Sequence, residues 1–271
     1  MTSLSFRQVI FLMHFYEHRI MVNRRRGIYL LPNLLTTSAL FAGFYSIIAA
    51  INGRFEAAAI AIFVAMILDG MDGRIARLTN TQSDFGVQYD SLSDLISFGL
   101  APALLIYQWS LFNLGKLGWS AAFIYTAAAA LRLARFNTQA GIEDKRYFQG
   151  LASPPAAALI AGMVWLGDSF GLSDERFAVI VTLPITVITG ILMVSNVRYH
   201  SFKQIDLKSR IPFFTVLIVV LIFFLLSSNP PFVLTTAAFC YACSGPLFTL
   251  IMLRKHRASR KQSEPGTEID D

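Results

Sequence analysis

The sequence predicts an all-α membrane protein, a polytopic helical bundle of about eight transmembrane helices. Apolar residues make up 55% of the 271 residues and charged residues only 15%, whereas soluble chains average roughly 25% charged. The mean hydropathy of +0.54 is correspondingly high. Apolar stretches of about 20 residues recur along the chain, and that length crosses a hydrocarbon core of roughly 30 Å. Together these observations exclude a soluble fold.

Apolar runs and the polar breaks between them predict the position of each span. The spans are expected at 31–51, 55–78, 86–108, 118–137, 153–168, 176–196, 211–227 and 231–253. The breaks are rich in turn-forming residues, such as Asn52-Gly53-Arg54 after the first span. Pro32 and Asn33 suit the start of the first helix, where Asn33 can act as its cap. Because the connections are short, no second domain is expected.

The two ends of the chain differ from the transmembrane domain expected at residues 29–254. Residues 1–28 are basic, and Arg7, Glu17 and Arg19 flank or interrupt their apolar residues, as is typical of an amphipathic helix at a membrane surface. Residues 255–271 finish with the acidic sequence SEPGTEIDD and are expected to form a disordered tail.

The lysines and arginines predict the orientation in the membrane. An even number of spans places both termini on one face, and 20 of the 23 basic residues then lie on that face. The other face has only Arg54, Lys116 and Arg176. The positive-inside rule therefore places both termini in the cytoplasm, with the chain integral to the inner (cell) membrane. Membrane topology explains the net charge of +6, and no nucleic-acid partner is expected.

Four aspartates lie in or beside the second and third spans, where an uncompensated charge costs several kcal/mol. Asp69 and Asp72 are three residues apart and share one helix face, and Asp90 and Asp94 are four apart and share another. The short connection makes the two helices antiparallel neighbours, so the carboxylates should converge near the cytoplasmic boundary. Such a cluster needs protons or cations, and an all-oxygen ligand set suits two Mg²⁺ or Mn²⁺ ions. Paired ions of this kind commonly serve displacement at phosphorus.

Small residues beside these aspartates leave room for a ligand. Gly73 and Ala76 lie on the same face of the second span as Asp69 and Asp72. Gly86 lies on the same face of the third span as Asp90 and Asp94. A planar or diphosphate-bearing ligand can lie against the exposed backbone, and Arg77 can pair with phosphate oxygens. Small residues also pack helices together, and for Gly86 this alternative is equally good.

The stretch from Asp69 to Asp94 reads D-G-M-D-G-R-I-A-R, then eight residues, then G-x3-D-x3-D. It resembles the signature of the CDP-alcohol phosphotransferase family at every fixed position. The resemblance implies a six-helix core, here with two additional helices, and a homodimer. It also implies that Asp69, Asp72 and Asp90 bind two divalent cations that hold the diphosphate of a CDP-linked substrate. Asp94 would lie by the metals too and act as the catalytic base.

The same resemblance implies where CDP-diacylglycerol binds. Cytidine would pack near Gly73 and Ala76, and Pro32 and Asn33 would lie close to the nucleotide. The implied contacts of this substrate are Asn33, Asp69, Gly73, Ala76, Arg77 and Gly86.

Three further stretches resemble one bacterial branch of this family, in which L-serine is the acceptor. They are LPNLLT at 31–36, SDLISFGLAP at 93–102 and ALRLARFN at 130–137. A fourth stretch, FQGLASPP, departs from the branch at Ala152, where proline is usual.

The carboxylate of serine favours a guanidinium partner. Arg135 is the preferred contact, Arg132 is the second candidate, and Asn137 and Ser153 are neutral donors nearby. Either arginine could instead be an ordinary positive-inside anchor.

The sequence thus predicts a transferase of phospholipid biosynthesis that converts CDP-diacylglycerol and L-serine into phosphatidylserine and CMP. Two alternatives remain. Glycerol phosphate or inositol phosphate as acceptor would require an extra basic pocket for its own phosphate. An ion-coupled transporter would also place carboxylates in the membrane, but no internal repeat is visible and the acidic residues gather at one face.

Overall fold

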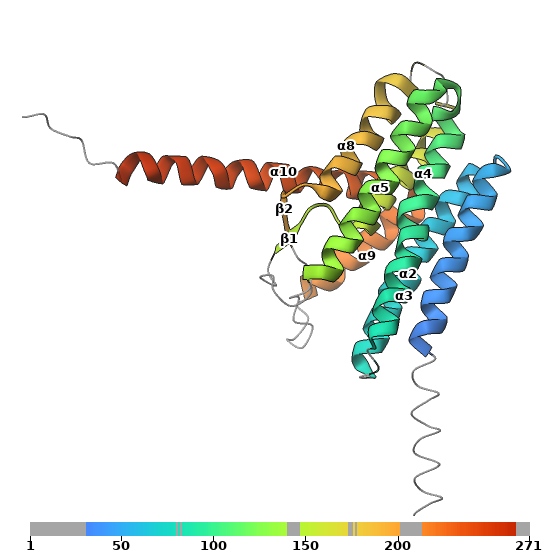
Figure 1. Cartoon of the computed structure of the whole chain (residues 1–271), viewed down its shortest axis with the longest axis horizontal. Coiled ribbons are helices and arrows are strands. Elements are labelled where there is room, and N and C mark those ends of the chain that lie inside the picture. Colours follow the sequence, from blue (N-terminus) through green and yellow to red (C-terminus); the bar gives the residue numbers. More distant parts are fainter. Residues whose placement is uncertain are drawn as a thin grey trace, which may run out of the picture.

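The computed structural model describes residues 31–79, 81, 83–139, 147–172, 176, 178–200 and 213–263 as a bundle of helices (Figure 1). The amphipathic segment expected at residues 1–28 and the acidic end of the chain at 264–271 lie outside these residues.

The first two helices form an antiparallel pair at one side of the bundle. The helix Leu31–Ile51 is followed by α2 (Phe55–Leu78), and both match the predicted spans. Gly53 makes the turn between them with φ +70°, a left-handed conformation that glycine adopts without steric cost. The apolar runs therefore end at the turn residues that the sequence indicated.

The third predicted span is one helical rod, Asp84–Leu114, that begins near the aspartates. It consists of α3 (Asp84–Asp94), the π-helical segment η1 (Leu95–Leu100), α4 (Ala101–Ile106), the π-helical segment η2 (Tyr107–Leu111) and the 3₁₀ turn η3 (Phe112–Leu114). The Ser83 side chain caps its start by accepting from the backbone N–H of Gly86 at 3.1 Å.

The remaining spans are also helical. They are α5 (Lys116–Gln139), α6 (Ser153–Ser169), η4 (Ala178–Thr182) with α8 (Leu183–Val194), α9 (Phe213–Ser228) and α10 (Pro230–Ser263). The predicted helical membrane bundle is confirmed, since each of the eight predicted spans coincides with a helix of the described residues.

The last helix is longer than expected. Because α10 continues to Ser263, residues 255–263 are helical and not part of a disordered tail. Its C-terminal part extends away from the bundle (Figure 1).

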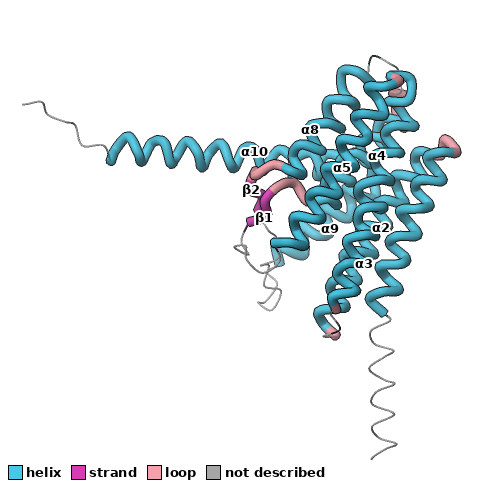
Figure 2. The backbone as a smooth tube through the Cα atoms, viewed as in Figure 1, coloured by secondary structure: helices cyan, strands magenta, loops and turns pink. Residues whose placement is uncertain are grey.

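One feature of the fold was not predicted: two short strands that join the loops at the aspartate end of the bundle (Figure 2). Strand β1 (Tyr147–Gln149) pairs antiparallel with β2 (Arg198–His200), with Phe148 opposite Tyr199. The pairing connects the segment before α6 to the segment after α8. Three-residue strands give too short an alternation to be recognised from sequence.

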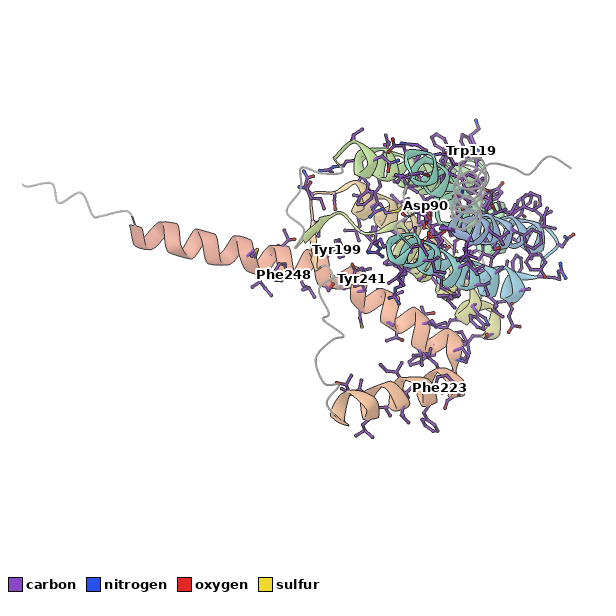
Figure 3. All side chains as sticks on the ribbon, turned by 90° about the horizontal axis from the view of Figure 1, so that it is seen from below. Asp90, Trp119, Tyr199, Phe223, Tyr241 and Phe248 are labelled. Atoms are coloured by element: carbon purple, nitrogen blue, oxygen red, sulfur yellow. The ribbon has the colours of Figure 1, made fainter. Side chains whose placement is uncertain are left out.

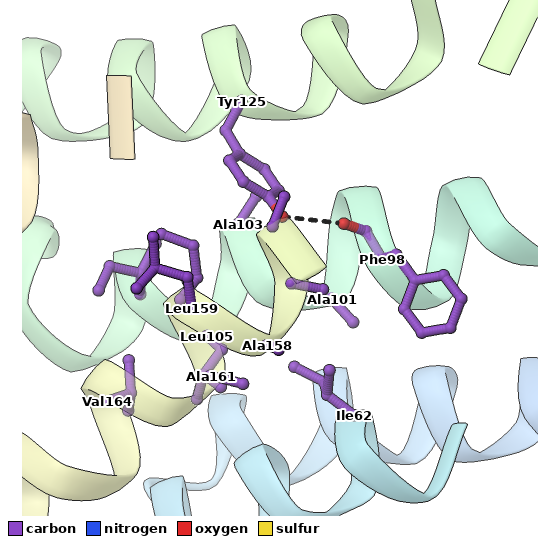
Figure 4. Close-up of a cluster of buried hydrophobic side chains, with 14 of the residues drawn as sticks. Ile62, Phe98, Ala101, Ala103, Leu105, Tyr125, Ala158, Leu159, Ala161 and Val164 are labelled. Carbon is purple, nitrogen blue, oxygen red and sulfur yellow. Dashed lines mark hydrogen bonds between the residues drawn. The ribbon is translucent and has the colours of Figure 1, made fainter. Parts of the chain in front are cut away.

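Alanine dominates the core, which allows the helix backbones to approach closely. Around α6, for example, Ala101, Ala158 and Ala161 pack together (Figure 4). A buried hydrogen bond of 3.1 Å from the Tyr125 hydroxyl to the Phe98 carbonyl lies in the same cluster (Figure 4). Such packing fixes the spacing of the helices that carry the aspartates.

Large apolar side chains cover the outside of the bundle. Phe41, Phe123 and Leu131 are more than half exposed, as is Phe223 on α9. Four helices are individually long and apolar enough to cross a membrane: Leu31–Ile51, Asp84–Leu114, Lys116–Thr138 and Pro230–Met252. A surface of this kind is stable against lipid and not against water, so the protein is membrane-embedded.

Candidate active site

The four aspartates lie together where α2 faces α3. Single carboxylate oxygens of Asp69, Asp72 and Asp90 all lie within 4.8 Å of one another. Asp94 joins them because its carboxyl group is within hydrogen-bonding reach of Asp69. The helical spacing of three residues on α2 and four on α3 brings these side chains to the facing surfaces. The predicted convergence is therefore present.

Asp72 is anchored by the first helix of the bundle. The residue is 4% exposed, and its Oδ2 accepts a hydrogen bond of 2.7 Å from the hydroxyl of Thr36. Thr36 was not singled out from the sequence, although it closes the LPNLLT stretch. The contact couples the helix Leu31–Ile51 to the aspartate cluster.

The carboxylate of Asp90 is incompletely hydrogen bonded within the described residues. Its Oδ1 is buried and has no hydrogen-bond partner among the described residues. A buried unpaired carboxylate oxygen is costly, and a hard divalent cation is the partner that three converging carboxylates fit best. The donor set of this cluster thus suits a divalent metal site.

A cavity of about 380 Å³ opens beside Asp72 and Asp90. Its lining includes five of the residues predicted to contact CDP-diacylglycerol: Asn33, Gly73, Ala76, Arg77 and Gly86. It also includes Pro32, which the resemblance placed near the nucleotide. Sequence reasoning missed the remaining lining residues: Thr36, Thr81, Ser83, Val87 and Phe136. The lining as a whole comes from the first helix, α2, α3 with the residues before it, and α5. The proximity of these four segments is a property of the tertiary structure.

Gly73 leaves space in the cavity wall, and Arg77 lies at the rim of the cavity. A Cβ added to Gly73 would meet no atom within 4 Å, so the α2 backbone is bare toward the cavity. The Arg77 Nε–H donates to the Gly73 carbonyl at 2.8 Å, which holds the exposed guanidinium at the cavity rim.

The residues predicted to bind serine fall into two groups. Arg132 and Ser153 form the first: the Arg132 Nη1 group donates to the Ser153 hydroxyl at 3.1 Å, and the guanidinium interacts electrostatically with Asp94. Asn137 lies on the same helix and donates from its amide to the Ser91 hydroxyl of α3 at 3.0 Å.

Arg135 forms the second group and links the loops at this end of the bundle. Its Nη2 group donates to the side-chain oxygens of Gln149 and Asn196, and its Nη1 group donates to the Val194 carbonyl at 3.4 Å. These contacts tie α5 to the β1 strand and to the end of α8. Of the two candidate arginines, Arg132 is the one that interacts electrostatically with the aspartate cluster, through Asp94.

Fold and site together define an integral membrane protein with a carboxylate cluster beside a polar cavity at one end of the bundle. The chain belongs to the CDP-alcohol phosphatidyltransferase family, whose sequence model matches residues 29–188. It is therefore an enzyme, a transferase of phospholipid biosynthesis.

Several proteins with assigned names are similar to this chain. A relative from Helicobacter pylori named CDP-diacylglycerol–serine O-phosphatidyltransferase is 40% identical over 195 residues, covering 70% of this chain and 80% of the relative. A protein of the same name from Mycobacterium leprae is 36% identical over 155 residues, covering 55% and 51%. An archaetidylserine synthase from Methanothermobacter thermautotrophicus is 34% identical over 171 residues, covering 62% and 69%.

Proposed function

We propose that the chain transfers the phosphatidyl group of CDP-diacylglycerol to the hydroxyl of L-serine, releasing CMP and leaving phosphatidylserine in the bilayer. The observation that carries the proposal is the convergence of Asp69, Asp72 and Asp90 beside the cavity. The names of the relatives support serine as the acceptor.

Two divalent cations, Mg²⁺ or Mn²⁺, belong to this proposal. The residues that would hold them are Asp69, Asp72, Asp90 and Asp94, and the unpaired Oδ1 of Asp90 supports their assignment. The ions would neutralise the diphosphate and the charge that develops on it during transfer.

The cavity is proposed to take the nucleotide. Its volume of about 380 Å³ lies in the range of small-molecule sites, roughly 300–1,000 Å³. Gly73 and Ala76 leave space for the cytidine, Arg77 supplies a cation for the diphosphate, and Asn33 and Gly86 complete the lining. The acyl chains remain in lipid beside the apolar faces of the bundle.

Asp94 is proposed to act as the general base. It accepts the proton of the serine hydroxyl while the hydroxyl oxygen attacks the lipid-linked phosphorus. The bond from that phosphorus to the oxygen of the CMP phosphate breaks, and CMP leaves with the electron pair. Arg132 and Ser153 would bind the serine carboxylate, with Asn137 as a neutral donor, and Arg135 would hold the surrounding loops.

One assay tests the reaction class and the acceptor together. The purified protein is incubated with CDP-diacylglycerol, Mg²⁺ or Mn²⁺ and a panel of serine, ethanolamine, glycerol phosphate and inositol phosphate, and the lipid product is identified. The proposal expects phosphatidylserine and an equal amount of CMP. A lipid product from another alcohol in preference to serine would contradict it.

The proposed location is the inner membrane, with the termini and the active site facing the cytoplasm. A reporter fused after Asp271 and one inserted between Thr79 and Ser83 are expected to report the cytoplasm, because CMP and serine must exchange with water there. A reporter next to Lys116 should report the opposite face. A cytoplasmic signal at Lys116 would contradict the topology.

We also propose that the transmembrane domain at 29–254 forms a homodimer, as the family resemblance implies. Cross-linking in native membranes is expected to give a species of twice the monomer mass.

A further inference from the structure

The aspartate cluster has two sides, and only one of them is the cavity. The cavity lining comes mainly from the first helix, α2 and α3. Asp94 is not among the lining residues and interacts instead with Arg132 of α5, which is hydrogen bonded to Ser153 at the start of α6. A nucleotide in the cavity would therefore not occupy the other side of Asp94, which faces α5 and α6. That side remains available to the acceptor.

Arg132 is only partly satisfied on that side. Its Nη1 group donates to Ser153, which is 1% exposed, but its Nε atom is buried and has no hydrogen-bond partner in the described parts of the chain. A buried guanidinium N–H without a partner is costly unless a ligand supplies the acceptor. The planar donor geometry of arginine matches a carboxylate.

Tyr241 of α10 also interacts electrostatically with Arg132, and it lies beyond the residues 29–188 that the family model matches. Tyr241 is half-buried and packs its ring against Tyr199 of β2 with the centroids 5.5 Å apart. Figure 3 shows both tyrosines where α10 meets the bundle. The phenol oxygen of Tyr241 is an acceptor suited to a guanidinium.

Close packing on both sides of Tyr241 holds α10 in this position. Before it, Gly162 of α6 allows contact with α10, since a Cβ there would lie 2.6 Å from the hydroxyl of Thr235. After it, a Cβ on Gly245 would lie 2.3 Å from the Tyr199 ring. The Tyr199 hydroxyl also donates to the Ala242 carbonyl at 3.0 Å. Strand β2 thus serves, through Tyr199, as the docking surface that aligns Tyr241.

We propose that Tyr241 is a positioning residue for the acceptor. Its phenol oxygen orients the Arg132 guanidinium so that the Nε–H and an adjacent N–H of the same guanidinium face the carboxylate of the incoming amino acid. The inference rests on the proposed function. It assigns α10 a part in acceptor selection, in addition to its place in the bundle.

The test compares Tyr241→Phe with Tyr125→Phe by steady-state kinetics at varied serine and varied CDP-diacylglycerol. Tyr241→Phe should raise the serine KM roughly tenfold, the effect of losing one hydrogen bond between the misoriented Arg132 guanidinium and the serine carboxylate. Its kcat at saturating serine and its KM for CDP-diacylglycerol should stay within about twofold of wild type, because transition-state contacts are unchanged. Tyr125→Phe loses a buried hydroxyl contact to the Phe98 carbonyl and should leave the serine KM unchanged.

A double-mutant cycle separates positioning from general packing. In an Arg132→Lys background, which removes the guanidinium, Tyr241→Phe should change the serine KM less than twofold. Equal effects in both backgrounds, or an unchanged serine KM in the single variant, would overturn the inference while the proposed function stands. Wild-type protein that makes no phosphatidylserine would instead overturn the proposed function. Thermal unfolding in detergent establishes that both tyrosine variants are folded.

Discussion

Replacing Asp90 with asparagine is expected to lower turnover by more than about 100-fold. Mutating a residue that only hydrogen bonds to a metal ligand already lowers metal affinity or activity by about 10- to 100-fold, and Asp90 is itself a proposed ligand. The variant loses a negative oxygen at the position where the buried Oδ1 has no hydrogen-bond partner within the described part of the chain. Affinity for Mn²⁺, measured by isothermal titration in the absence of substrate, should fall by at least about tenfold. Turnover of the wild type should also stop in excess chelator and return when metal is restored.

The matched control for this variant is Asp84→Asn on the same helix. Asp84 is exposed in the first turn of α3 and does not belong to the carboxylate cluster. The control makes the same chemical change at a similar position and should leave both Mn²⁺ affinity and turnover close to wild type. Full activity of Asp90→Asn, or of the wild type in chelator, would contradict the metal assignment.

Replacing Asp94 with asparagine is expected to reduce kcat by about 100- to 10,000-fold, the usual contribution of a general base. The amide cannot take the proton of the attacking hydroxyl. Because Asp94 does not line the cavity and interacts with Arg132 on the other side of the cluster, its loss should leave the KM for CDP-diacylglycerol within a few-fold of wild type. Single-turnover measurements with saturating serine isolate the chemical step.

Mn²⁺ affinity distinguishes the two roles of Asp94. A variant with slow chemistry and nearly unchanged Mn²⁺ binding supports the base. A loss of Mn²⁺ binding as large as that of Asp90→Asn would make Asp94 chiefly a metal ligand. An unchanged single-turnover rate would remove it from the reaction altogether.

The sequence alone was sufficient to predict the helices and the composition of the carboxylate cluster. Apolar spans in lipid must satisfy their backbone groups internally, so a run such as 55–78 has essentially one structure, and α2 has these bounds. Helical spacing likewise determines which side chains share a face, so Asp69 and Asp72, like Asp90 and Asp94, could be placed together before the fold was known. These features depend on local periodicity, which can be observed in sequence.

Only the tertiary structure decided which residues from distant segments meet. Arg132 and Arg135 are three residues apart and chemically identical. Arg132 interacts electrostatically with Asp94, whereas Arg135 donates hydrogen bonds to Gln149 and Asn196. The Thr36 contact to Asp72 and the docking of α10 through Tyr199 likewise depend on packing between segments remote in sequence. No local pattern encodes such contacts, because the rotation of each helix about its axis is determined by the close packing of small residues against its neighbours.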